Sequence, residues 1–524
     1  MREVELVLVS LLLAVAVFGA AARALRIPYP IVLVLGGLLL GFVPGLPPVR
    51  LQPDLVLVIF LPPLLYAAAF FANLRDLRAD LRSISLLAIG LVLATAAVVA
   101  LIAHAVVPGI GWAAAFALGA IVAPTDPIAA TTIARRLGVP RRIVTILEGE
   151  SLLNDGTALV AYKLAVAAAV GGTFSAPRAG WEFVAGAAGG IAIGLAAGWV
   201  IAEVRRRLDD VVLETTISLL SGYAGYVPAE QLGCSGVLAA VSTGIYVGFR
   251  APEISSARQR LSGYGMWEIL QFVLNALLFV LIGLQLPAIL DGLGGRSAGV
   301  LLGQAAAVSA GVIMTRMTWL AVSPQIIRAL DRRPAQRARR IGWRERLISA
   351  WSGMRGAVSL AAALALPAGF PERNLILFVT FAVILVTLVL QGLTLPLLIR
   401  RLGIHDDGAE GEEELVARRR ATDAALVRLD ELAMQVWTRE DTVTRMRNLY
   451  DYRRRRLDAR AGDGEEDDGD GYEVRSYRYQ KMVREVIAAQ HSAIVELRNR
   501  GAISNEVMHR LERELDLERE RLEI

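Results

Sequence analysis

Long apolar runs separated by short polar stretches make up most of the first 403 residues of the chain. A helix of about 20 apolar residues spans the hydrocarbon core of a bilayer, and hydropathy separates about thirteen such segments here. They cover approximately residues 4–22, 29–46, 54–73, 84–106, 111–134, 143–171, 181–203, 211–229, 232–249, 267–290, 298–327, 347–368 and 375–399. The pattern predicts an all-α polytopic membrane protein with about 13 transmembrane helices. The first segment lacks a strongly basic start, so we expect it to be retained rather than cleaved as a signal peptide.

Arginines are distributed unevenly over the loops that these segments define. If the C-terminus is cytoplasmic, the inner side carries 25 of them, including Arg205, Arg206 and Arg207, and the outer side carries 5. The positive-inside rule favours this topology over its inverse. An odd number of helices then places the N-terminus outside, and we expect a multi-pass protein of the cytoplasmic membrane.

The chain divides in composition near residue 403. We predict a transmembrane domain at 1–403 and a mainly helical cytoplasmic tail at 404–524, with two amphipathic stretches (407–460 and 472–522) around an acidic linker at 462–471. From residue 405 the tail holds 22 Lys and Arg against 29 Asp and Glu, a net charge of −7, which leaves +12 for the membrane part. The basic excess therefore belongs to the membrane loops and does not indicate nucleic-acid binding. The tail contributes none of the charges that are buried in the membrane domain. We therefore expect it to regulate or stabilise that domain rather than to form part of its site.

Charged side chains fall inside four of the apolar segments. Asp126 lies in the fifth segment, Glu150 and Asp155 in the sixth, Arg316 in the eleventh and Arg355 in the twelfth. At 1.5 Å per residue they lie roughly 10–18 Å from the inner ends of their helices. A charge at that depth is unfavourable enough to indicate function. This set of opposite charges predicts a path for a cation or a proton.

Two of these segments contain helix-breaking sequences. Prolines 124 and 127 bracket Thr125-Asp126, and proline removes amide donors and disfavours helix in the residue before it. The twelfth segment carries Gly353-Met354-Arg355-Gly356. Transporters with inverted repeats pair broken helices at corresponding positions of their two halves. If helices 1–6 repeat as 8–13, helices 5 and 12 correspond, and we predict both to be broken.

The sixth segment places its polar residues on one helical face. Two pairs are each four residues apart, Glu150 with Asn154 and Ser151 with Asp155. The pairs are adjacent, so all four side chains share one face of the helix. Glu148 points elsewhere, which favours a structural role at the inner end.

Four sequence pieces together resemble the monovalent cation:proton antiporter-1 family, the bacterial sodium/proton antiporters related to eukaryotic sodium/proton exchangers. They are FLPPLLYAAAF (60–70), APTDPIAA (123–130), GESLLNDGTALV (149–160) and GMRGAVSLAAALAL (353–366). The resemblance covers residues 1–403. It implies a homodimer with a dimerisation domain and a mobile six-helix core that moves like an elevator, exchanging Na⁺ for H⁺.

The resemblance also implies roles for single residues. Asp155 is similar to the shared cation- and proton-binding carboxylate, with Thr125 and Ser151 as further oxygen ligands of Na⁺. Asp126 and Asn154 resemble the pair that supports the crossing of the unwound helices. Glu150 and Arg316 resemble a buried ion pair, and Arg355 is the arginine of the second broken helix. The Asn154–Asp155 pair resembles the electroneutral type. Some members carry Glu where Ala67 follows Tyr66 here, so a ligand from that helix is not expected.

Chemistry limits the alternatives. Desolvation favours the protonated form of a carboxylate in an apolar site, so Na⁺ and a proton can compete for Asp155. No nucleotide-binding loop or catalytic triad is present in the sequence, so we expect no enzyme, no cofactor and no nucleotide, with membrane lipids and a second copy of the chain as partners. Exchange of Li⁺ or K⁺ for H⁺, a cation channel, and a receptor or scaffold that is indifferent to Asp155→Asn remain as alternatives.

Overall fold

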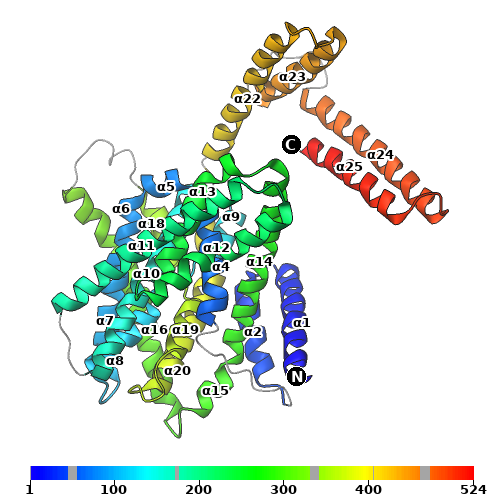
Figure 1. The fold of residues 1–524 in the computed structure, drawn as a ribbon. Helices are drawn as coiled ribbons and strands as arrows, with labels where there is room; N and C mark the ends of the chain where they lie inside the picture. The colour runs from blue at the N-terminus through cyan, green and yellow to red at the C-terminus, as the bar shows by residue number, and fades with distance from the viewer. Residues whose placement is uncertain are drawn as a thin grey trace. The chain divides into compact units, whose positions relative to one another are not determined.

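The computed structural model describes residues 2–44, 56–171, 176–330, 341–404, 406, 408–460 and 472–523. It forms two compact units, Met1–Asp406 and Asp407–Ile524. All regular elements of the described residues are helical, which confirms the prediction of an all-α protein (Figure 1). The acidic linker at 462–471 lies outside the described residues.

The first unit is a bundle of long and interrupted helices. Its first half contains α1 (Arg2–Leu25), α2 (Tyr29–Gly41), the π-helical turn η1 (Val56–Phe60), α4 (Leu61–Phe71), α5 (Leu74–Ala79), α6 (Leu81–Ser85), η2 (Leu86–Leu91), α7 (Val92–Val106), α8 (Trp112–Val122), α9 (Ile128–Arg136) and α10 (Arg141–Gly171). Its second half contains α11 (Ala176–Arg206), α12 (Val211–Gln231), α13 (Gly236–Ile254), α14 (Ala257–Leu284), α15 (Leu286–Asp291), α16 (Ala298–Leu330), α18 (Trp343–Trp351), α19 (Ala357–Leu364), α20 (Arg373–Val386), η3 (Thr387–Gln391) and α21 (Gly392–Leu402).

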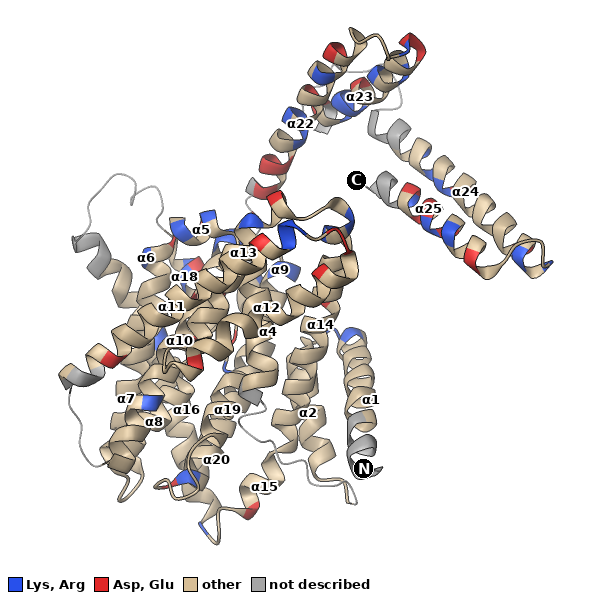
Figure 2. Cartoon of the chain, viewed as in Figure 1, with Lys and Arg blue, Asp and Glu red and all other residues tan. Residues whose placement is uncertain are grey.

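Within the described residues, five runs are long and apolar enough, by length and composition, to cross a membrane. They are Leu81–Val106, Gly180–Arg206, Ala257–Asp291, Ala298–Gln325 and Arg373–Leu402. Other predicted segments form shorter apolar helices, or carry the charges and interruptions that the sequence places in them. Figure 2 shows Lys and Arg concentrated around α5 at one end of this unit, whereas its middle carries few charges.

The helices of the first unit pack in two neighbouring groups. In one, α4 packs against α12 and α13, α11 packs against α13, and α2 packs against α14. In the other, α7 packs against α8 and α16, α8 packs against α10, and α20 packs against α16 and α19. The largest apolar core runs through the second group and reaches α2 and α14.

Two interruptions lie where the sequence predicts them. The chain leaves the helix between the end of α8 at Val122 and the start of α9 at Ile128, and again between α18 and α19. The two unwound segments meet, since the Asp126 backbone N–H donates to the Met354 carbonyl oxygen at 2.8 Å. This bond satisfies a donor that the broken helix leaves without an intrahelical partner.

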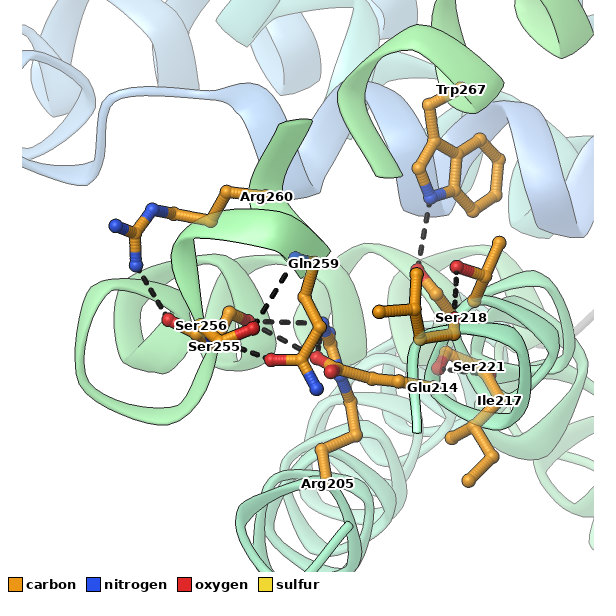
Figure 3. A network of polar contacts seen from close by, with 12 residues as sticks. Arg205, Glu214, Ile217, Ser218, Ser221, Ser255, Ser256, Gln259, Arg260 and Trp267 are labelled. Atoms are coloured by element: carbon orange, nitrogen blue, oxygen red, sulfur yellow. Dashed lines mark hydrogen bonds and ion pairs between the residues drawn. The ribbon is translucent and has the colours of Figure 1, made fainter. Parts of the chain in front are cut away.

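A second polar network ties α11, α12 and α14 together at one end (Figure 3). Arg205 Nε donates to Glu214 Oε1 at 2.9 Å, and the two side chains are only 7% and 2% exposed. Ser255 accepts from Arg205 and donates to Glu214, both at 3.2 Å. Arg205 is therefore buried, and it is not the loop arginine that the sequence predicted. The preceding helix continues to Arg206, which carries Arg205 into the packed interface where Glu214 neutralises it.

Arg205 and its neighbour Arg206 give a matched test of this burial. Arg205→Ala should lower the free energy of unfolding by about 3–5 kcal/mol, because it leaves Glu214 as an uncompensated buried charge. Arg206→Ala should change stability little, because that side chain is 59% exposed and its partner is the surface residue Glu203. Thermal unfolding of both variants in the same detergent measures the difference. Equal melting temperatures would contradict the assigned burial.

The described residues of the second unit form four helices, whereas the sequence predicted two amphipathic stretches. They are α22 (Ala409–Ala433), α23 (Glu440–Arg460), α24 (Tyr472–Asn499) and α25 (Asn505–Glu523). Gly501 adopts a left-handed conformation (φ 72°) and closes α24, while the Ser504 hydroxyl accepts from the Val507 N–H to cap α25. Helical periodicity continues across such a turn, so the pattern alone does not reveal it.

Candidate functional site

A cavity of about 150 Å³ lies between α4, α10, α14, α19 and the first unwound segment. Four of the eight site residues named from the sequence line it: Thr125, Asp126, Ser151 and Asp155. The other four lie behind this wall and support it: Glu150, Asn154, Arg316 and Arg355. The sequence-based set therefore divides into residues that contact the cavity and residues that hold them.

The polar face of α10 has two parts with different partners. Ser151 and Asp155 are one helical turn apart and reach the cavity. Asn154 instead donates to the Thr125 hydroxyl at 2.9 Å, and that hydroxyl donates to Glu150 Oε1 at 3.0 Å. The resemblance assigned Thr125 as a sodium ligand. In the structure its hydroxyl mainly joins α10 to the unwound segment and keeps one lone pair for a ligand.

Glu150 and Arg316 form a buried ion pair between α10 and α16. The arginine side chain is 1% exposed and the glutamate side chain 2%. Arg316 Nη1 and Nη2 contact the two carboxylate oxygens, the second at 2.8 Å, and Nη2 and Nε also donate to the Ser349 carbonyl at 3.0 and 3.2 Å. Bidentate pairing with further hydrogen bonds is the geometry in which a buried pair is best compensated. The pair fixes α10 to both α16 and the first part of the second broken helix.

Asp126 and Arg355 lie at opposite dipole ends of the broken helices. Asp126 Oδ1 accepts from the Ile128 N–H at 2.9 Å, at the N-terminus of α9, where negative charge is favoured. Arg355 Nε donates to the Val122 carbonyl at 3.0 Å, at the C-terminus of α8, and Nη1 donates to the Gly353 carbonyl just after α18. The backbone N–H of Arg355 donates to the Thr387 hydroxyl at 3.1 Å. The two charges thus compensate half-helix ends rather than each other.

Gly356 allows the second broken helix to touch Asp126. A Cβ at this position would lie 2.7 Å from Asp126 Cγ, closer than real Cβ atoms come. Gly356→Ala should push the Asp126 carboxylate away from the α9 N-terminus, lowering stability by about 1–3 kcal/mol and slowing transport. Gly369→Ala is the control, because nothing lies within 4 Å of its added methyl. Thermal unfolding and flux measurements on both variants test this. Wild-type stability and transport in Gly356→Ala would contradict the close contact with Asp126.

The cavity offers only oxygen and amide groups to a ligand. Two carboxylates, Asp126 and Asp155, line it together with the hydroxyls of Thr125, Ser151 and Ser359. The Ser359 hydroxyl is buried without a hydrogen-bond partner among the described residues. Hard oxygen donors suit alkali cations and not soft metals. The described residues contain no cluster of three or more His, Cys, Asp or Glu that could hold a resident metal ion.

Three features of this region were not predicted from the sequence. Ser359 lies within the quoted GMRGAVSL piece but was not singled out. Gln271 and Asn275 of α14 line the cavity, and their i, i+4 spacing inside an apolar run was the available signal. Glu214 was likewise visible as an acid inside an apolar segment, one short loop after Arg205.

Comparisons with known proteins agree with this architecture. The family model described as "Sodium/hydrogen exchanger, transmembrane" matches residues 9–401. An uncharacterized Na⁺/H⁺ exchanger of Mycobacterium tuberculosis is 37% identical over 98% of this chain and 95% of its own length. A Na⁺/H⁺ antiporter of Aphanothece halophytica is 35% identical, over 82% of this chain and 80% of that protein.

Among solved structures, the sodium proton antiporter MjNhaP1 of Methanocaldococcus jannaschii shares the fold. The TM-score is 0.57 at 19% identity, and the match covers 76% of this chain and 99% of that one. The family match spans most of the first unit, including both broken helices and the cavity. This chain therefore belongs to the sodium/hydrogen exchanger family.

Proposed function

We propose that this protein exchanges Na⁺ for H⁺ across the membrane and that Asp155 binds the two ions alternately. One observation carries the proposal. Asp155 is 6% exposed and borders the cavity, yet no hydrogen bond or ion pair joins its side chain to another described residue. A buried carboxylate without a protein partner needs either a proton or a cation from the cavity.

Competition for a single carboxylate produces exchange without an energy source other than the ion gradients. Protonated Asp155 is neutral, and so is Asp155 with bound Na⁺, whereas the empty carboxylate is charged. If the protein changes conformation readily only when this charge is neutralised, each cycle carries one Na⁺ in one direction and one proton in the other. The neighbour of Asp155 on α10 is Asn154, which does not titrate, and the other carboxylate of the cavity, Asp126, accepts a hydrogen bond from the Ile128 N–H. Both features support electroneutral exchange of one Na⁺ for one H⁺.

The finer architecture is part of the proposal. We assign the helices of the first unit to thirteen transmembrane spans, with α8–α9 and α18–α19 as the broken helices of two inverted repeats. We propose that the N-terminus lies outside and the tail in the cytoplasm, because arginines are concentrated in the loops on the side of the tail. We propose a homodimer in the cytoplasmic membrane, in which the group containing α10, α16 and both broken helices moves like an elevator against the group containing α4 and α11–α14.

The names of the relatives do not determine which alkali cation is transported. A relative from Bacillus pumilus, 35% identical over 71% of this chain and 58% of its own length, carries the name sodium, potassium, lithium and rubidium/H⁺ antiporter. We favour Na⁺, with Li⁺ and K⁺ as the alternatives that the assay must compare. A cation channel is the other class of function for the same acids.

Proton flux in vesicles tests the proposal. The full chain is reconstituted in liposomes containing a pH-sensitive dye, and NaCl, LiCl, KCl or choline chloride is added outside. We expect a Na⁺-dependent pH change that persists when valinomycin and K⁺ clamp the membrane potential. Because protons compete with Na⁺, the apparent KM for Na⁺ should rise as the pH falls, approaching about tenfold per pH unit. Cation flux without proton counterflow would identify a channel, and sealed vesicles without cation-dependent proton flux would refute antiport.

A further inference from the structure

Two amides of α14 border the cavity. Gln271 and Asn275 are one helical turn apart, half-buried, and both line the cavity together with Ser151 and Asp155. Apart from these two residues, α14 is apolar from Leu270 to Leu284. Polar groups placed at this depth in an apolar helix indicate a function.

The packing of α14 fixes the direction of the two amides. Trp267, one turn before Gln271, donates its indole N–H to the Ser218 hydroxyl of α12 at 2.9 Å (Figure 3). Its ring also packs on Tyr66 of α4, with centroids 5.5 Å apart. At the other end, Gly283 lies against the backbone of α2, where a Cβ would meet the Leu38 nitrogen at 2.5 Å. Held on both sides, α14 cannot readily rotate the amides away from the cavity.

Neither amide is engaged in linking helices. Asn and Gln in membrane helices commonly bond to a neighbouring helix. Within the described residues, no side-chain hydrogen bond involves Gln271 or Asn275, although both have donors and acceptors to use. Their groups are therefore available to the contents of the cavity.

We propose that Gln271 and Asn275 select the transported cation, because their amide oxygens replace water molecules of its hydration shell. This inference rests on the proposed antiport. Amide oxygens are neutral hard ligands, of the kind that oxygen-liganded cations accept, and they do not take up protons near neutral pH. Asp155 thus supplies the charge for which Na⁺ and H⁺ compete, whereas the amides interact with the cation alone.

The test is a KM measurement in proteoliposomes on Gln271→Met and Asn275→Leu, which keep size and remove the amide. Each should raise the apparent KM for Na⁺ about fivefold, the equivalent of one net hydrogen bond of about 1 kcal/mol. The ratio of the Na⁺, Li⁺ and K⁺ constants should change, while the maximal rate and the proton-binding constant extracted from KM against pH stay as in the wild type. Asn275→Ser, which restores an oxygen, should recover part of the affinity. Ser262→Ala, exposed on the same helix and away from the cavity, is the control.

Three results would overturn the inference. The first is an unchanged KM and ion preference in both variants. The second is a lower maximal rate at unchanged KM, which marks a structural role. The third is a changed proton-binding constant, which places the amides on the proton path. A wild-type protein without cation-dependent proton flux would instead refute the antiport on which the inference rests, so the two failures are distinguishable.

Discussion

Asp155→Asn is expected to reduce Na⁺-dependent proton flux to the level of empty vesicles while the protein still folds and inserts. Asn keeps the shape of the side chain but removes both the proton site and the negative charge that binds Na⁺. Asp155 forms no hydrogen bond or ion pair with other described residues, so its loss should leave packing and stability nearly unchanged. The measurement is dye-monitored proton flux beside thermal unfolding of the same preparation.

Glu148→Gln serves as the matched control for this variant. Glu148 lies on the same helix, but it pairs at 2.7 Å with Arg135, whose side chain is 67% exposed. Removing its charge should leave exchange intact, because it does not border the cavity. Measurable Na⁺-dependent flux in purified Asp155→Asn protein would disprove the assignment of the shared carboxylate. Loss of flux in Glu148→Gln as well would point to a general charge effect at this helix.

The sequence contained the positions of the breaks and of the buried charges because both depend on local information. Prolines and glycines act on the helix that contains them, and depth follows from counting residues along an apolar run. Helical spacing also placed Ser151 and Asp155 on one face. These steps need no knowledge of the neighbouring helix.

The remaining features depend on which helices meet. Whether Arg205 belongs to a loop or to the core is decided by a shift of one helical turn and by the position of Glu214 on the next helix. The engagement of the Thr125 hydroxyl by Glu150 and Asn154 requires the crossing of α10 with the unwound segment. The amides of α14 are visible in the sequence, but only tertiary packing shows that they line the same cavity as Asp155.

Breaking the Glu150–Arg316 pair from either side should lower the free energy of unfolding by about 3–5 kcal/mol, because one buried charge then lacks its counterion. The double variant Glu150→Leu/Arg316→Met should recover much of this loss, since it removes both charges. Recovery should stay incomplete, because Thr125 loses its acceptor and the Ser349 carbonyl loses its arginine donor. Thermal unfolding of the two single variants and the double variant forms a double-mutant cycle.

Two outcomes would contradict this assignment. Wild-type stability of either single variant would show that the remaining charge does not need its partner. Additive effects of the single variants in the double variant would show that the two charges do not neutralise each other, because charges that compensate each other are coupled in such a cycle.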